Sequence, residues 1–358
     1  MKRILLIALA GLLLVAGITA LVLTRDGERT TPEGSGIVAL ASGEFEAFVL
    51  PDYADAALSD DYKSYFVEVE PGLKMHVLEV GEGYPVYLQH GNPTNAMLYR
   101  KVAEELPRDR FRLIMPTMIG LGFSSKVPAS EHTLDNHITW TKAAMDQLGV
   151  EQAIYVGQDW GGPIGMGVLA RSPELLQGAV VMNTGFIAPE EERALSTMHA
   201  TVSTPIVGEF LIEGIGSIFD SLGDVQGDPA SMPADVTALY ARPVEESGNG
   251  KAPLALMRMV PAGPDHPSVA QMREIEAYVA TLDIPAELVW GMNDPILAQG
   301  LESMKGQFPD AAVTETEAGH FLQEEVPGEI AAAIGRVYAQ IAVEEDVDTG
   351  AERQSAAE

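Results

Sequence analysis

The 358-residue chain contains no cysteine, which excludes disulfide bonds, a thiolate nucleophile and cysteine ligands to a metal. Basic residues are scarce: 22 Lys and Arg stand against 52 Asp and Glu, which gives a formal net charge of -30 at pH 7. Nucleic acids and anionic membrane surfaces attract basic patches, so this balance argues against both as partners. The histidines lack the spacing of metal motifs such as H-E-x-x-H, and we expect neither a metal nor an organic cofactor.

A long apolar run stands at the start of the chain, from Ile4 to Leu23, directly after Lys2 and Arg3. A run of this length can cross a bilayer core of about 30 Å, and the basic residues before it would hold the N-terminus inside. Residues 1–24 therefore predict either an uncleaved signal anchor, which would be a transmembrane helix, or a cleaved signal peptide. In both cases we expect an exported protein, in the periplasm or at the extracytoplasmic face of the inner membrane.

From about Tyr62 onward, short apolar runs alternate with segments of helical period. Alternation of this kind predicts an α/β fold with a mostly parallel sheet and helices on both faces. A helix is expected from Leu134 to Leu148, with Thr133 as its N-terminal cap and Gly149 just past its end. The runs expected to form strands are Met75–Val80, Pro85–Gln89, Phe111–Met115, Ala153–Val156, Ala179–Met182, Ala286–Trp290 and Ala312–Thr316.

Composition divides the chain into further segments. Residues 25–60, with Gly, Pro, Thr and acidic side chains, predict a linker with a short ordered stretch at Phe45–Leu50. Residues 187–271 contain no convincing β-run and predict a helical cap, inserted after the sixth strand, over a core formed by residues 61–186 and 272–342. A second independent domain is the alternative for that interval. The acidic, Ala-rich residues 343–358 predict a disordered tail.

Residues that follow the expected strands carry the chemistry, because ligands of an open parallel sheet bind beyond the carboxyl ends of its strands. Asn92, Asp159, Asp294 and His320 each come shortly after a different strand. Asp159 lies at the centre of the frame Gly-Gln-Asp-Trp-Gly, where hydrolases with a G-x-S-x-G elbow carry serine. The order nucleophile, acid, histidine is that of the α/β-hydrolases, so we predict a catalytic triad of Asp159, Asp294 and His320.

These motifs resemble the haloalkane dehalogenases, a family of α/β-hydrolases with a helical cap. The resemblance covers roughly residues 62–342 and is carried mainly by HGNPT at residues 90–94, QDWGGPIG at 158–165 and GHF at 319–321. It implies hydrolysis of a carbon–halogen bond to an alcohol, halide and a proton, with a small apolar halogenated compound and water as reactants. Many relatives carry Asp where this chain has Thr117, a departure that concerns loop packing and none of the proposed chemistry.

The resemblance implies a role for each of these residues. Asp159 would displace the halide and become an alkyl ester, since a carboxylate is already anionic at neutral pH and suits an sp³ carbon with a leaving group. His320 would then activate a water molecule, and Asp294 would orient the imidazole. Asn92 and Trp160 are expected to bind the halide through their side chains and to form the oxyanion hole with their backbone N–H groups.

Comparison with the family also bears on which residue is the acid of the triad and on which residues line the pocket. In one variant of the family the acid is a Glu after the sixth strand, but residues 183–185 here are Asn-Thr-Gly, which leaves Asp294 as the acid. Phe210, Ile218 and Phe219 in the expected cap are apolar pocket candidates, and the resemblance adds Pro261 and Phe321. His90 is interpreted as a structural residue that shapes its loop, and Trp140 and Trp290 as core residues.

Two other functions remain open from the sequence. Epoxide hydrolases use the same Asp nucleophile together with tyrosines from the cap, but Tyr240 is the only tyrosine between Ile187 and Gln271. The second alternative is a membrane-tethered interaction protein that keeps the hydrolase fold without catalysis.

Overall fold

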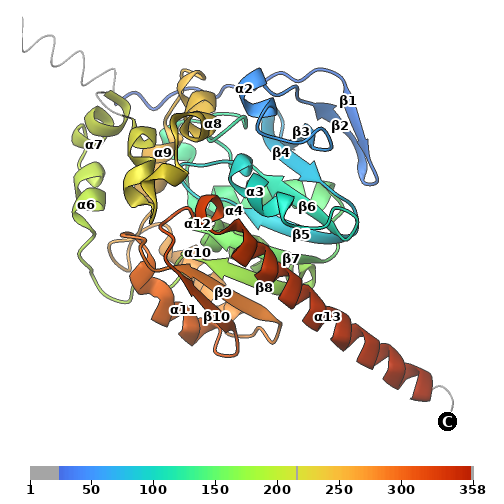
Figure 1. Cartoon of the computed structure of the whole chain (residues 1–358). Helices are drawn as coiled ribbons and strands as arrows, with labels where there is room; N and C mark the ends of the chain where they lie inside the picture. Colours follow the sequence, from blue (N-terminus) through green and yellow to red (C-terminus); the bar gives the residue numbers. More distant parts are fainter. Residues whose placement is uncertain (1–23, 215–216, 356–358) are drawn as a thin grey trace, which may run out of the picture.

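Ten strands form one mixed sheet in the computed structural model, which describes residues 24–214 and 217–355 (Figure 1). The strand order is β1-β2-β3-β4-β6-β5-β7-β8-β9-β10. Strands β6, β5, β7, β8, β9 and β10 pair in parallel, whereas β1 to β4 pair antiparallel with one another and β4 pairs antiparallel with β6. The predicted α/β fold with a mostly parallel sheet is confirmed.

Each predicted apolar run lies within one of the strands β4 to β10. The central strand β7 is buried along its whole length, as expected for a parallel strand covered on both faces. The strands are β1 Ile37–Leu40, β2 Gly43–Ala47, β3 Lys63–Glu70, β4 Leu73–Val80, β5 Tyr84–Gln89, β6 Phe111–Pro116, β7 Ala153–Gln158, β8 Leu176–Met182, β9 Ala286–Gly291 and β10 Ala312–Thr316.

The stretch from residue 25 to 60 is not the linker that its composition suggests. Strands β1 and β2 form an antiparallel hairpin, and β2 continues the main sheet through the pairs Glu46–Phe66 and Ala47–Tyr65. The Phe45 ring also packs against Tyr65, with ring centroids 5.3 Å apart. Strands β1 and β2 are short and half-exposed, so their sequences alone do not indicate strands. They are ordered because β2 pairs with the edge of β3.

Helices pack on the sheet in two groups. The long C-terminal helix α13 contacts β7, β8, β9 and α3, while α5 contacts β5, β7 and β8 and packs against α4 and α10. Helix α4 begins as predicted, because the Thr133 hydroxyl accepts a hydrogen bond from the Asn136 N–H at 3.1 Å. The α-helices are α2 Asp52–Asp55, α3 Arg100–Glu104, α4 Leu134–Gln147, α5 Gly161–Ala170, α6 Thr197–Ser203, α7 Val207–Glu209, α8 Ala234–Glu245, α9 Ala252–Arg258, α10 Val269–Val279, α11 Leu301–Gln307, α12 Leu322–Glu325 and α13 Pro327–Ser355.

The described residues between β8 and β9 are helical and contain no strand. Helices α6 to α9 gather at one end of the sheet (Figure 1), joined by the 3₁₀ helices η5 (Ile218–Val225) and η6 (Pro229–Ser231). Helix α10 differs from them, because it packs on α5 beside the sheet. The helical part placed over the strand ends therefore comes from α6 to α9.

The end of the chain also departs from expectation. Residues 343–358 were expected to be a disordered tail, but α13 continues as one helix to Ser355. Ala, Glu and Gln are good helix formers and no proline follows Pro327, so nothing in this stretch ends the helix.

The prediction of a membrane anchor and an exported location requires correction. Across residues 24–214 and 217–355, every helix is too short or too polar to cross a membrane. Helix α13 is the longest of them, with 29 residues, but charged side chains occur along it. The apolar run Ile4–Leu23, on which the prediction was based, lies outside the described residues.

Candidate active site

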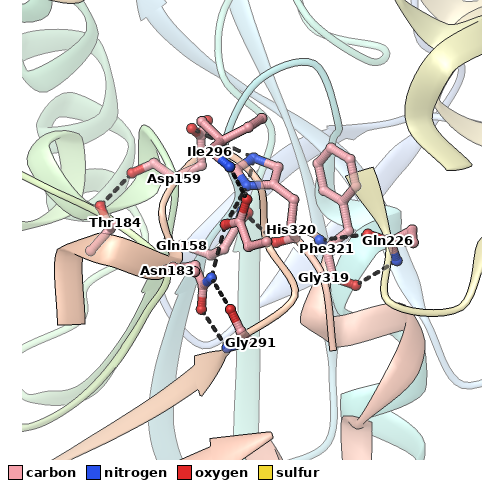
Figure 2. Close-up of polar contacts among 12 residues, drawn as sticks. Gln158, Asp159, Asn183, Thr184, Gln226, Gly291, Ile296, Gly319, His320 and Phe321 are labelled. Atoms are coloured by element: carbon pink, nitrogen blue, oxygen red, sulfur yellow. Dashed lines mark hydrogen bonds and ion pairs between the residues drawn. The ribbon is translucent and has the colours of Figure 1, made fainter. Parts of the chain in front are cut away.

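Asp159 occupies a sharp turn between β7 and α5. Its backbone has φ of 51°, a conformation that residues other than glycine rarely adopt and that is typical of a nucleophile elbow. Two contacts with the end of β8 hold this turn: the Asp159 N–H donates to the Asn183 carbonyl at 3.0 Å, and the Thr184 hydroxyl donates to the Asp159 carbonyl at 2.6 Å (Figure 2). The carboxylate is thus presented beyond the carboxyl end of the sheet.

The structure brings the three predicted triad residues together. His320 Nε2 lies 3.7 Å from Asp159 Oδ2, and His320 Nδ1 lies 2.9 Å from Asp294 Oδ2. Asp294 is held in turn, because its Oδ1 accepts from the Ile296 N–H at 2.7 Å and its Oδ2 accepts from Asn183 Nδ2 at 2.8 Å. The Asp294 carboxylate can only accept a hydrogen bond, so His320 Nδ1 carries the proton and donates it to Asp294. Nε2 of the neutral ring is then an acceptor, and it faces Asp159.

Burial and charge act on these three groups in different directions. Burial raises the pKa of Asp159, and the His320 charge and the backbone N–H groups of Trp160 and Asn92 offset part of that rise. For His320, burial alone would lower the pKa, but the Asp294 and Asp159 carboxylates outweigh it and the pKa is raised. Burial opposes ionisation of Asp294 as well, yet His320, Asn183 and the Ile296 N–H hold its pKa below the ordinary value. An imidazole between two carboxylates is therefore well suited to take up a proton.

Asn92 and Trp160 flank the Asp159 carboxylate. The Asn92 N–H donates to Asp159 Oδ1 at 2.7 Å, and the Trp160 N–H also hydrogen bonds to this carboxylate. The Asn92 side chain donates one Nδ2 hydrogen to the Pro253 carbonyl in α9 at 3.1 Å, which leaves its second hydrogen free. Trp160 lines the cavity in front of Asp159. Two backbone donors thus act on the carboxylate, and both residues also line the cavity in front of it.

A cavity of about 650 Å³ opens in front of Asp159. Apolar side chains from both the core and the segment between β8 and β9 line it, among them Ile187, Leu222, Val225, Val260, Pro261 and Phe321. The two residues proposed by resemblance, Pro261 and Phe321, are thus in the wall.

The two cap phenylalanines expected in the pocket do not reach it. Phe210 is 44% exposed, and Phe219 is buried on the other side of η5. The helical register explains the error for Phe219, because η5 turns Ile218, Leu222 and Val225 toward the cavity and Phe219 away from it. Residues that the sequence did not single out lie in the wall instead, including Arg193 and His199 from the segment that contains α6.

His90 takes the structural part expected of it. Its Nε2 accepts from the Met118 N–H at 2.9 Å and its Nδ1 lies 2.8 Å from the Gly91 carbonyl, so the buried ring links two loops at the strand ends. Burial lowers the pKa of His90 to about 4, which keeps the imidazole neutral. Trp140 and Trp290 are also buried in the core. Within the described part of the chain, no group of three His, Asp or Glu side chains is placed to hold a metal ion.

A strand-end carboxylate at a strained elbow, followed along the chain by an acid and a histidine, defines an α/β-hydrolase site. The family model for the α/β hydrolase fold matches residues 84–214. Haloalkane dehalogenase 2 of Mycobacterium tuberculosis is 31% identical over 266 residues, which cover 73% of this chain and 90% of the relative. The chain therefore belongs to the haloalkane dehalogenase family, as the motifs predicted.

Two further relatives bear on the site. The chain is 29% identical to a cis-3-alkyl-4-alkyloxetan-2-one decarboxylase of Shewanella oneidensis, over 75% of this chain and 86% of that protein. The crystal structure of haloalkane dehalogenase DatA from Agrobacterium tumefaciens superposes with a TM-score of 0.70 at 25% identity, covering 80% of this chain and 99% of that one. The similarity therefore extends over nearly the whole length of these relatives.

Proposed function

We propose that this protein hydrolyses carbon–halogen bonds of small apolar halogenated compounds through a covalent alkyl ester on Asp159. The observation that carries the proposal is the position of the Asp159 carboxylate. Its Oδ1 is bound by the Asn92 N–H, while Oδ2 lies 3.7 Å from the acceptor nitrogen of an imidazole paired with Asp294. Membership of the haloalkane dehalogenase family supports the same reaction.

In the first step, Asp159 Oδ2 attacks the carbon that bears the halogen. A carbon–oxygen bond forms, the carbon–halogen bond breaks, and the halide leaves with the bonding electrons. The Trp160 indole N–H and the second Asn92 Nδ2 hydrogen are the donors we assign to the halide, since both residues line the cavity in front of Asp159 and Asn92 Nδ2 gives only one of its hydrogens to Pro253. No proton moves in this step.

In the second step, water hydrolyses the ester. His320 Nε2 takes a proton from water, and the resulting hydroxide attacks Cγ of the Asp159 ester. The backbone N–H groups of Asn92 and Trp160 stabilise the negative charge that develops on Oδ1. The Cγ–O bond to the alkoxide then breaks, and the alcohol leaves with the proton returned by His320. The carboxylic acid left on Asp159 releases its proton to solvent and becomes a carboxylate again.

The segment between β8 and β9 is proposed to act as a cap that shields this chemistry from bulk water. Its residues supply part of the apolar wall, and Pro253 in α9 orients the Asn92 amide. The described residues 61–186 and 272–342 hold the triad and form the core in this assignment.

Epoxide hydrolysis is disfavoured by the position of Tyr240. Its hydroxyl donates to Glu324 and accepts from Arg100 Nη1 at 3.3 Å, so the side chain is buried in an ionic cluster. Burial, with the Glu324 charge, raises the pKa of Tyr240 well above the usual range. No tyrosine of the described chain lines the cavity, so the acid that an epoxide oxygen requires is missing there.

The experiment that tests the function uses the purified full chain with 1-bromobutane at neutral pH and measures bromide. We expect steady bromide release by the wild type and none above background by Asp159→Ala. Styrene oxide is the comparison substrate: opening of the epoxide to a diol without any bromide release from bromobutane would refute the proposal. Retention of activity by Asp159→Ala would refute the nucleophile.

A further inference from the structure

The loop between η5 and η6 lies directly against the loop that carries His320. The His320 N–H donates to the Val225 carbonyl at 2.8 Å. The Phe321 N–H donates to Gln226 Oε1 at 2.8 Å, and Gln226 Nε2 donates back to the Phe321 carbonyl at 3.2 Å (Figure 2). The backbone on both sides of the imidazole is thus hydrogen bonded to the segment between β8 and β9.

The two loops are packed backbone against backbone. A Cβ atom on Gly319 would lie 2.3 Å from the Val225 carbonyl oxygen, so only glycine permits this approach. Glu325 closes the same junction, because its carboxylate accepts from the Gly319 N–H at 2.6 Å and the Asp228 N–H at 2.5 Å. Neither loop can move without disturbing the other.

The Gln226 side chain hydrogen bonds to the Phe321 backbone across this junction. It is 7% exposed, and its Nε2 has a second acceptor in Ser231 Oγ at 3.0 Å. The amide orientation is determined by its partners, since the opposite orientation would place its oxygen against the Phe321 carbonyl and its NH₂ against the Phe321 N–H. A buried amide with both ends satisfied holds its partners more firmly than an exposed one.

We propose that Gln226 is a positioning residue that holds the His320 loop so that Nε2 faces the water that cleaves the ester. This role rests on the proposed function. Gln226 hydrogen bonds to the backbone of Phe321, next to His320, and does not contact Asp159. His320 takes part in the second step, whereas halide displacement by Asp159 needs no proton transfer. Loss of Gln226 should therefore slow ester hydrolysis and leave carbon–halogen cleavage nearly unchanged.

The test compares Gln226→Leu and Gln226→Glu with the wild type in rapid mixing with 1-bromobutane. Bromide release reports the first step, and the mass of the quenched intact protein reports the alkyl ester. We expect a bromide burst of normal rate in both variants, followed by turnover slowed by about 10- to 100-fold and accumulation of the alkylated protein, because small misplacements of a catalytic group have effects of this size.

A matched control is Gln147→Leu. Gln147 is an exposed glutamine that is not part of the cavity wall, and its Nε2 also donates to backbone carbonyls, those of Glu68 at 2.8 Å and Ala143 at 3.2 Å. We expect wild-type rates for both steps in this variant. Melting temperatures identify any variant that fails to fold, and Gln226→Glu keeps the shape of the side chain should Gln226→Leu not fold.

The Gln226→Glu variant also tests the role through the pH dependence of its ester hydrolysis rate. A carboxyl that is protonated can again donate to the Phe321 carbonyl, so its hydrolysis rate relative to wild type should rise as the pH is lowered. Wild-type hydrolysis rates in both variants, or equal slowing of both steps, would overturn the role of Gln226. A wild-type chain that releases no bromide would instead refute the dehalogenase function.

Discussion

At the scale of single residues, the site depends on an imidazole whose two nitrogens have different partners. Asp294 accepts the Nδ1 proton, and Asn183 Nδ2 and the Ile296 N–H in turn fill the remaining acceptor positions of Asp294. Burial opposes the imidazolium, but the carboxylates on either side raise the pKa of His320 above 6.5. The base is therefore neutral only above this raised pKa, and activity should fall as the pH falls through it.

Replacing Asp294 with Asn should move the imidazole proton of His320 from Nδ1 to Nε2 and remove part of the rise in the His320 pKa. The Asn oxygen would accept from the Ile296 N–H, as Asp294 Oδ1 does, and its NH₂ would face His320 Nδ1. The imidazole would then carry its proton on Nε2 and could not accept one from water. We expect kcat to fall by about 10⁴-fold, the size seen when a triad acid becomes an amide. The acid limb of the residual activity should move to lower pH, because the charge that raises the His320 pKa is gone.

This prediction is checked by bromide release measured across pH 5–9. The control is Asp310→Asn, which removes one charge at an exposed position outside the site and should leave the profile unchanged. An Asp294→Asn variant that keeps the wild-type profile would mean that another group orients the base.

At the scale of helices and strands, the sequence predicted best what depends on local pattern. Strands β4 to β10 each contain the short run that the local pattern predicted, and the triad residues follow three of them in a motif that is recognisable without distant contacts. Strands β1 and β2 were missed because their order comes from pairing with β3, and the pocket side of η5 was missed because a 3₁₀ register differs from an α-helical one.

The role of Gln226 had no signal in the sequence for a related reason. A single glutamine in a loop is not distinguishable by pattern, and its distant partner Phe321 contacts it only after the segment between β8 and β9 has folded over the strand ends. Asn183 is a similar case. The sequence excluded it as the acid of the triad, but gave no indication that its amide donates a hydrogen bond to Asp294, which is that acid.

The elbow between β7 and α5 gives a prediction at this scale. A Cβ atom on Gly161 would lie 2.1 Å from the Gln89 carbonyl oxygen in the neighbouring strand β5, and backbone atoms cannot give way as a flexible side chain would. Gly161→Ala should therefore destabilise the fold by about 1–3 kcal/mol. Chemical unfolding in urea measures this loss. Gly335→Ala in α13 is the control, because open space surrounds that position, and it should be neutral or stabilising by up to about 1 kcal/mol. Equal stability of the two variants would contradict the strain at the elbow.

At the scale of the whole molecule, residues 26–31 join the two parts that build the site. We call this segment the N-terminal strap. Asp26 accepts from the Ala129 N–H at 2.8 Å and the Ser130 N–H at 2.9 Å, both in the core. The Glu28 carbonyl accepts from Asn249 Nδ2 at 2.6 Å, in the segment between β8 and β9. Thr30 then exchanges two backbone hydrogen bonds with Lys126, at 2.9 and 2.8 Å.

The strap should add to stability through these hydrogen bonds more than through its ion pairs. Arg29 pairs with Glu131 and Glu70, but both ends are partly exposed and such pairs contribute little. Bonds to backbone groups contribute about 1 kcal/mol each. Deleting residues 1–31 should therefore lower the melting temperature by about 5 °C or more relative to deleting residues 1–23, since 1 kcal/mol corresponds to roughly 2–4 °C in a domain of this size.

The shorter deletion is the matched control, because the two variants differ only in residues 24–31. Scanning calorimetry measures both melting temperatures, and bromide release shows whether the site survives. If the strap ties the segment between β8 and β9 to the core, the longer deletion should also loosen the junction at Gln226, which that segment forms with the His320 loop. Ester hydrolysis should then slow more than halide displacement. Equal melting temperatures for the two deletions would show that the strap follows the fold without stabilising it.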